Sequence, residues 1–143
     1  MTVRVERTMT VSAPPERVWE FISDPAQRAR PISVVEDWEI TGDDTATWHL
    51  SLPIPLVNRT ITIETEDVER REPEYVRFLG RSKVMRVQGE QELVATDEGG
   101  TEVTNRFVVD GKLPGVERFF KRNLDDELQH LETALREYLE LEA

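Results

Sequence analysis

The chain contains 143 residues, of which 38% are hydrophobic and 33% are charged, and it has no cysteine. This length is typical of one domain that can bury a core and enclose a modest cavity. Acidic residues outnumber basic residues 29 to 18, which gives a formal charge of −11. The acid excess argues against nucleic acid or an anionic membrane surface as a partner. The lack of cysteine excludes disulfides, thiolate catalysis and cysteine-based metal sites.

No apolar run approaches the length of a transmembrane helix, and residues 1–7 alternate apolar with charged side chains, unlike a signal peptide. We therefore expect a cytoplasmic protein without stable membrane insertion. The basic residues are nearly all arginine, with Lys83, Lys112 and Lys121 as the exceptions. An acid excess with so few lysines resembles proteins from high-salt cytoplasms, in which the acids form a solvated surface.

The first thirty residues predict a strand followed by short helices. Residues 2–11 alternate strictly, with Val3, Val5, Met9 and Val11 on one face, as in a half-buried strand. The prolines at 14 and 15 favour a helix start, and Asp24-Pro25 favours its end. A second helical turn is expected over residues 25–30.

From residue 34 the apolar period changes to two, which predicts about six antiparallel strands. The expected strands are bounded by turns at 41–44, 71–74 and 96–100, the last of which joins a long hairpin of residues 83–95 and 101–110. In that hairpin, Gln91 and Asn105 share the inward face with apolar residues.

The last segment predicts a long amphipathic helix. From Val116 to Tyr138, apolar residues recur in steps of three and four, which places them in one stripe. About 25 helical residues span roughly 37 Å, so this helix must lie across the sheet.

This order of elements predicts an α+β fold, in which a curved antiparallel sheet of about six or seven strands wraps around the C-terminal helix. Two short helices follow the first strand. The space between a strongly curved sheet and a helix is a ready ligand cavity.

Residues 12–25, with their Val18-Trp19 pair and Asp24-Pro25 stop, resemble the opening of the START-like helix-grip superfamily (SRPBCC). Leu113-Pro114-Gly115 before the long helix is similar too. Within the superfamily, the nearest groups are the polyketide cyclase/dehydrase and lipid-transport proteins. The resemblance implies one ligand-binding domain over residues 1–143, which binds or carries a lipid, quinone or polyketide-like molecule without a cofactor.

The resemblance also implies a pocket between the sheet and the long helix, lined by aromatic, aliphatic and methionine side chains. The candidate lining residues are Trp38, Trp48, Ile61, Ile63, Phe78, Met85, Phe107, Phe120 and Leu124. The alternative is that these side chains only fill the core. An inward amide at Gln91 or Asn105 needs a hydrogen-bond partner, which a ligand or a cavity water could supply, unless a bulge turns the amide to solvent.

The sequence offers no clear catalytic or metal-binding constellation. His49 and His130 have no metal-ligand spacing, and no serine lies in a GxSxG context. A cyclase or dehydratase would need one of Tyr75, His49 or Glu90 to face inward, whereas the strand pattern places all three outward. We therefore expect a binding protein, with such an enzyme as the alternative.

An apolar, proline-rich loop follows residue 52. Ile54 and Leu56 lie between prolines, and exposed apolar residues at such a tip can gate a cavity, with Leu113 on the facing rim. Two alternatives are a loop folded back over the core and an interaction module that docks on another protein.

Overall fold

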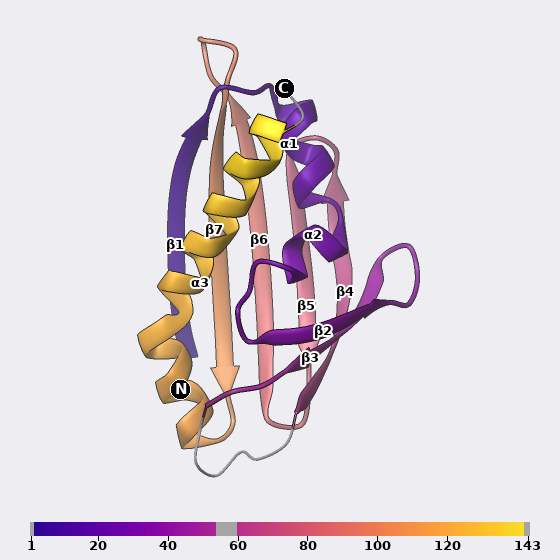
Figure 1. The fold of residues 1–143 in the computed structure, drawn as a ribbon, viewed down its shortest axis with the longest axis vertical. Helices are drawn as coiled ribbons and strands as arrows, with labels where there is room; N and C mark the ends of the chain where they lie inside the picture. Colours follow the sequence, from indigo (N-terminus) through magenta and orange to yellow (C-terminus); the bar gives the residue numbers. More distant parts are fainter. Residues whose placement is uncertain (1, 54–59, 142–143) are drawn as a thin grey trace.

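The computed structural model describes residues 2–53 and 60–141. Within these residues, a seven-stranded antiparallel sheet carries three helices on one face (Figure 1). The elements in chain order are β1 (Thr2–Val11), α1 (Pro15–Ile22), α2 (Pro25–Ala29), β2 (Val35–Ile40), β3 (Thr45–Leu50), β4 (Ile61–Arg71), β5 (Tyr75–Arg81), β6 (Met85–Ala95), β7 (Thr101–Gly111) and α3 (Pro114–Leu141).

The sheet order is β1-β7-β6-β5-β4-β3-β2, so β2 to β7 form a meander and β1 closes onto β7. In Figure 1, β2 and β3 cross in front of the long strands, on the side that carries the helices. The sheet therefore curls around one face, which we call the inner face. This arrangement confirms the predicted helix-grip fold, with its two short helices after β1.

The short helices begin and end where the local sequence predicts. Pro15 opens α1 and Pro25 opens α2, and both positions suit a residue without an N–H. The Asp24 carboxylate accepts a hydrogen bond from the backbone N–H of Ala26 at 2.9 Å and caps α2. These caps fix α1 and α2 over the inner face.

Helix α3 runs diagonally across the sheet and packs mainly on β1 and β7 (Figure 1). Its contact stripe is apolar and almost fully buried, and comprises Val116, Phe120, Leu124, Leu128, Leu131 and Leu135. Burying an aliphatic or aromatic side chain of this kind stabilises the fold by about 1.5–3 kcal/mol. The stripe therefore anchors α3 to the inner face.

The core consists of two apolar clusters, one beneath the first part of α3 and one between its last part and α1. A polar row runs across the inner face, in which Arg7 pairs with Asn105 and Asn105 pairs with Gln91. All three side chains point toward the helices, because they share the inner face with the buried apolar residues of their strands.

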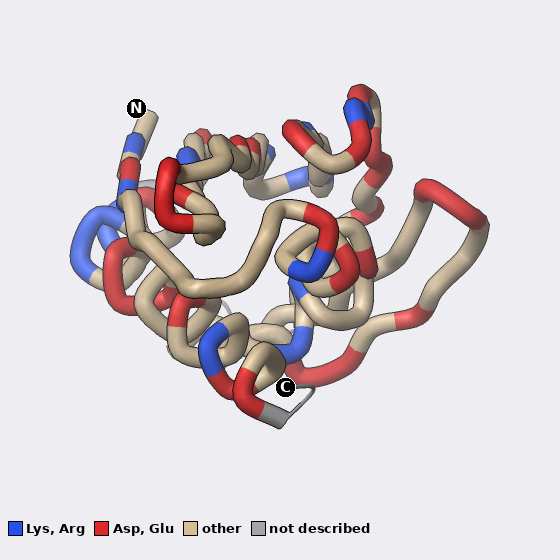
Figure 2. The backbone as a smooth tube through the Cα atoms, turned by 90° about the horizontal axis from the view of Figure 1, so that it is seen from above, with Lys and Arg blue, Asp and Glu red and all other residues tan. Residues whose placement is uncertain are grey.

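Acidic residues are spread around the backbone, on helices, strands and loops alike (Figure 2). In the described ranges, no helix is both long enough and apolar enough to cross a membrane.

Candidate functional site

A small cavity lies between the inner face and α3. Its volume is about 30 Å³, which holds a water molecule, whereas an apolar cavity of about 150 Å³ is known to bind benzene. The walls come from β3, β4, β6, β7, α3, the start of β2 and the segment before it. The lining residues are Ile32, Val34, Val35, Trp48, Leu50, Ile63, Met85, Val87, Phe107, Val109, Phe120, Leu124, Glu127 and Leu128.

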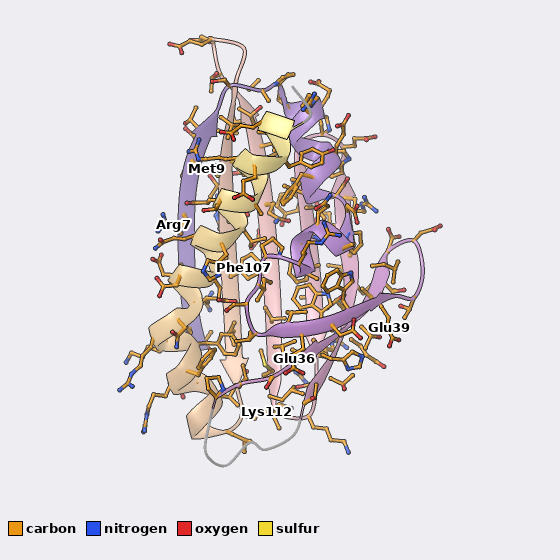
Figure 3. All side chains as sticks on the ribbon, in the orientation of Figure 1. Arg7, Met9, Glu36, Glu39, Phe107 and Lys112 are labelled. Carbon is orange, nitrogen blue, oxygen red and sulfur yellow. The ribbon has the colours of Figure 1, made fainter. Side chains whose placement is uncertain are left out.

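Aromatic side chains fill most of the hollow that the sequence predicted. The Phe78 ring lies 5.7 Å from the ring of Trp48 and 5.7 Å from that of Phe107, and Phe107 projects from the middle of the sheet (Figure 3). Phe78 also lies directly over Gly89, where a Cβ atom would collide with the ring. The site is therefore a nearly closed apolar interior, smaller than expected.

Six of the nine predicted apolar residues line this cavity, namely Trp48, Ile63, Met85, Phe107, Phe120 and Leu124. Ile61 and Phe78 are buried in the same apolar cluster without lining the cavity. Trp38, on the edge strand β2, does not line it either, and its half-buried ring lies 5.7 Å from the guanidinium of Arg30.

The predicted gate is only partly within the structure. Ile54 and Leu56 lie outside the described residues. Leu113 lies in the turn before α3 and is 41% exposed, and it is not part of the cavity wall. The gate, like the docking role of the same loop, stays a prediction.

Gln91 and Asn105 both lie on the inner face, 2% and 4% exposed. The bulge that could have turned either amide to solvent is not present, because β6 and β7 pair without a register shift. Among the described residues, Oε1 of Gln91 has no hydrogen-bond partner. An unpaired buried acceptor costs about 1–3 kcal/mol, so this amide is a candidate ligand contact.

An ion pair that the sequence did not reveal lies beside the aromatic side chains. Nη2 of Arg28 donates to Oδ1 of Asp67 at 2.8 Å, and the two side chains are 5% and 2% exposed. Burial lowers the pKa of Arg28, and the charge of Asp67 opposes this shift. The Arg28 guanidinium lies 5.0 Å from the centre of the Phe78 ring. A charged group therefore lies deep in the fold, next to the apolar interior.

Glu127 of α3 is the one charged residue in the cavity wall and is 5% exposed. Its two carboxylate oxygens accept from the backbone N–H and the hydroxyl of Ser33, at 2.8 and 2.6 Å. Nδ1 of His130 lies 3.2 Å from Oε1 of Glu127. These contacts fasten the segment before β2 onto α3 and close that side of the cavity.

Arg7 joins β1 to α3 (Figure 3). It donates to Glu132 at 3.1 Å and to Asp125 at 3.1 Å. These hydrogen bonds, first to Glu132 and then to Asp125, raise the pKa of Arg7. A cation on the inner face is thereby matched by two acids on the helix that covers it.

The acid–base candidates of the sequence lie on the outer face. The Tyr75 hydroxyl donates to Glu90 at 2.7 Å, and burial, followed by that hydrogen bond, raises the pKa of Tyr75 to about 12. His49 lies near Glu39 across the same face, with Nε2 and Oε1 3.6 Å apart. Tyr75, Glu90 and His49 therefore do not reach the cavity.

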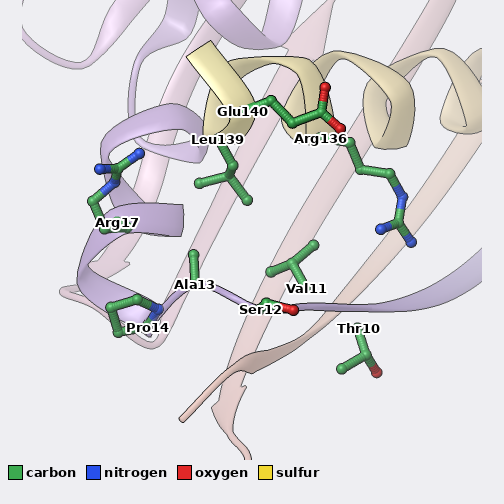
Figure 4. A pocket seen from close by; sticks show the side chains of 9 residues that line it. All are labelled: Thr10, Val11, Ser12, Ala13, Pro14, Arg17, Arg136, Leu139 and Glu140. Carbon is green, nitrogen blue, oxygen red and sulfur yellow. The ribbon is translucent and has the colours of Figure 1, made fainter. Parts of the chain in front are cut away.

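A second, open hollow of about 420 Å³ lies outside the core, where the end of β1, the start of α1 and the end of α3 meet (Figure 4). It is lined by a mixture of small, polar and charged side chains, namely Thr10, Val11, Ser12, Ala13, Pro14, Arg17, Arg136, Leu139 and Glu140. Its open, mixed surface contrasts with the enclosed apolar cavity beneath α3.

In residues 2–53 and 60–141, no three histidine, aspartate or glutamate side chains gather closely enough to hold a metal ion.

A family model described as polyketide cyclase/dehydrase and lipid transport matches residues 2–136. The chain belongs to this family. No curated protein matches it in sequence. The family is named for two roles, cyclisation or dehydration of polyketides and transport of lipids.

Solved structures share the fold at low sequence identity. A START superfamily protein from Mycobacterium smegmatis superposes with a TM-score of 0.77 at 16% identity, over 98% of this chain and 99% of that chain. A conserved protein from Geobacillus kaustophilus gives 0.75 at 17% identity, over 98% and 96%. The Zhui aromatase/cyclase from Streptomyces sp. R1128 gives 0.68 at 18% identity, over 96% and 94%. At this identity the likeness establishes the fold alone.

Proposed function

We propose that the protein binds a small apolar molecule between the inner face of its sheet and α3. The supporting observation is the apolar wall of the cavity, to which five strands and α3 contribute side chains. Thirteen of the fourteen lining residues are hydrophobic, which is the surface that an apolar ligand requires. The family's lipid-transport and polyketide roles both involve ligands of this kind.

Binding requires the lining to move, because the cavity of about 30 Å³ is smaller than any such ligand. Met85 and Leu124 are unbranched at Cβ and can change rotamer, and methionine in particular adapts to irregular shapes. The segment before β2 is held to α3 by the Ser33–Glu127 contacts. If that segment moves away from α3, a ligand can enter the cavity.

Calorimetric titration with naphthalene, a small rigid apolar probe, tests the proposal. Leu124→Trp places a larger side chain in the cavity and should weaken binding at least about tenfold, which corresponds to about 1.4 kcal/mol. Leu139→Trp makes the same change on the same helix, but at the open hollow, and should leave binding unchanged. Absence of binding to the unaltered protein, or equal binding to both variants, would contradict the proposal.

A second candidate function is proton transfer on the bound molecule, and the position of Glu127 in the cavity wall favours it. A buried carboxylate next to a bound ketone can remove a proton from the carbon beside the carbonyl, and the resulting enolate then takes a proton back from the same acid. The fold neighbours include an aromatase/cyclase.

Exchange of the α-protons of 2-tetralone in deuterated buffer, followed by proton NMR, tests this second function. The unaltered protein should accelerate exchange, and Glu127→Gln should abolish the acceleration. Glu64→Gln makes the same change on the outer face and is the control. If the protein binds the ketone without accelerating exchange, it is a carrier and not an enzyme.

A further inference from the structure

Two buried polar side chains, those of Arg28 and Trp48, contact the Phe78 ring, and a third, that of Gln91, lies on the neighbouring strand. The Arg28 guanidinium lies 5.0 Å from the ring centre, and the Trp48 ring lies at 5.7 Å. Gln91 lies on the inner face of β6, two residues beyond the Gly89 that supports Phe78. Phe78 itself is 1% exposed. The ring therefore lies between the apolar cavity wall and a set of polar groups.

Each of these three side chains has polar atoms without a hydrogen-bond partner in the described part of the chain. They are Nε and Nη1 of Arg28, Nε1 of Trp48 and Oε1 of Gln91. Oδ2 of Asp67, the partner of Arg28, also has no hydrogen-bond partner among the described residues. Nε of Arg70 lies 3.8 Å from this oxygen. Donors and acceptors are thus both available, at residues that are almost completely buried.

The charges in this cluster are already balanced. Arg28 is paired with Asp67 at 2.8 Å, and Arg70 is paired with Asp44 at 2.9 Å. A ligand carboxylate would add an unmatched negative charge to a buried site, which is strongly unfavourable. A neutral hydroxyl adds no charge, accepts from Arg28 or Trp48, and donates to Gln91.

We propose that Arg28, Trp48 and Gln91 recognise a neutral hydroxyl group on the apolar molecule, at the place that the Phe78 ring now occupies. This inference rests on the proposed function, because it names the chemistry of the ligand for the same interior. The ligand displaces the Phe78 ring, its apolar body fills the cavity, and its hydroxyl donates to Gln91 and accepts from Arg28 or Trp48.

The test compares the affinities of naphthalene, 2-naphthol and 2-naphthoate by calorimetric titration. The unaltered protein should bind 2-naphthol about tenfold more tightly than naphthalene, as expected for one or two net hydrogen bonds. The carboxylate should bind more weakly than either. Phe78→Ala should tighten binding of both neutral probes and keep the preference for the hydroxyl.

The double variant Arg28→Met with Asp67→Leu removes the buried ions together, so that no charge is left unpaired. This variant should still bind naphthalene. Its affinity for 2-naphthol should exceed its affinity for naphthalene by no more than about threefold. Gln91→Leu should also reduce the preference for 2-naphthol over naphthalene. This variant tests the hydroxyl site if the double variant fails to fold. The matched control is Arg106→Met with Glu92→Leu, which removes an ion pair of 3.2 Å on the outer face and should leave the tenfold preference intact.

The two proposals fail in different ways. If the unaltered protein binds none of the three probes, the binding function itself is wrong. If naphthalene and 2-naphthol bind equally well, or if the preference survives in both Arg28→Met/Asp67→Leu and Gln91→Leu, the hydroxyl site is wrong while the binding function stands.

Discussion

Gly89 on β6 leaves the space in which the Phe78 ring of β5 lies, since any Cβ at position 89 would overlap the ring. Phe78 contacts both Trp48 and Phe107, so its position determines how much of the interior is filled. This pair of residues therefore packs directly behind two residues of the cavity wall, Trp48 and Phe107.

Gly89→Ala should destabilise the fold by about 1–3 kcal/mol, the usual cost of overpacking a core. Urea denaturation measures the effect. In a Phe78→Ala background the new methyl group has room, and the same substitution should cost close to nothing. An equal loss of stability in the two backgrounds would show that the Phe78 ring does not need the space left by Gly89.

The Arg28–Asp67 pair should depend on both partners. Asp67→Asn leaves the guanidinium buried without a counter-charge and should lower the free energy of unfolding by about 3–5 kcal/mol. Arg28→Met with Asp67→Leu removes both charges and should be far less damaging than Asp67→Asn alone. Urea denaturation of the single and double variants checks this, and an additive loss would contradict the buried pair.

The Ser33 hydroxyl should hold the segment before β2 onto α3. Ser33→Ala removes a hydrogen bond of 2.6 Å to the Glu127 carboxylate and should cost about 1.5–3 kcal/mol. Amides 32–35 should then exchange faster with deuterium, and naphthalene should associate faster because the segment opens more often. The exposed Ser51 offers the control, since Ser51→Ala should change neither rate.

Stability should fall at alkaline pH because of Tyr75. Its pKa is raised from 10.0 to about 12 in the folded protein, so folding favours the protonated phenol. This contribution to stability is fully present below pH 10 and is lost as the pH rises toward 12. An ultraviolet titration should show one tyrosine ionising near pH 12, and Tyr75→Phe should remove that transition. Ionisation of Tyr75 at the pH of an unfolded chain would contradict the structure.

The sequence predicted the sheet, the helices and the inward faces well, because apolar periodicity reports burial directly. The apolar stripe from Val116 to Tyr138 predicted the long helix α3. Strict alternation of apolar and polar residues predicted that Gln91 and Asn105 lie on the inner face. The same alternation puts position 7 inward, but the acids that Arg7 meets depend on the rotation and tilt of α3, which periodicity alone does not define.

The site itself was harder to predict, because it depends on long-range packing. Arg28 and Asp67 are 39 residues apart, and a register shift between Asp67 and Glu69 interrupts the pairing of β4 with β5. Strand patterns do not reveal such a shift. The tight packing beside the cavity includes the fit of Phe78 over Gly89, a contact between two strands that depends on the exact register.

Intermolecular NOEs between 2-naphthol and the methyl groups of the protein test the central claim most directly. The account predicts NOEs to Met85, Val109 and Leu124, which line the cavity beneath α3. NOEs confined to Val11 and Leu139, which line the open hollow, or no binding up to the solubility limit of the probe, would contradict it.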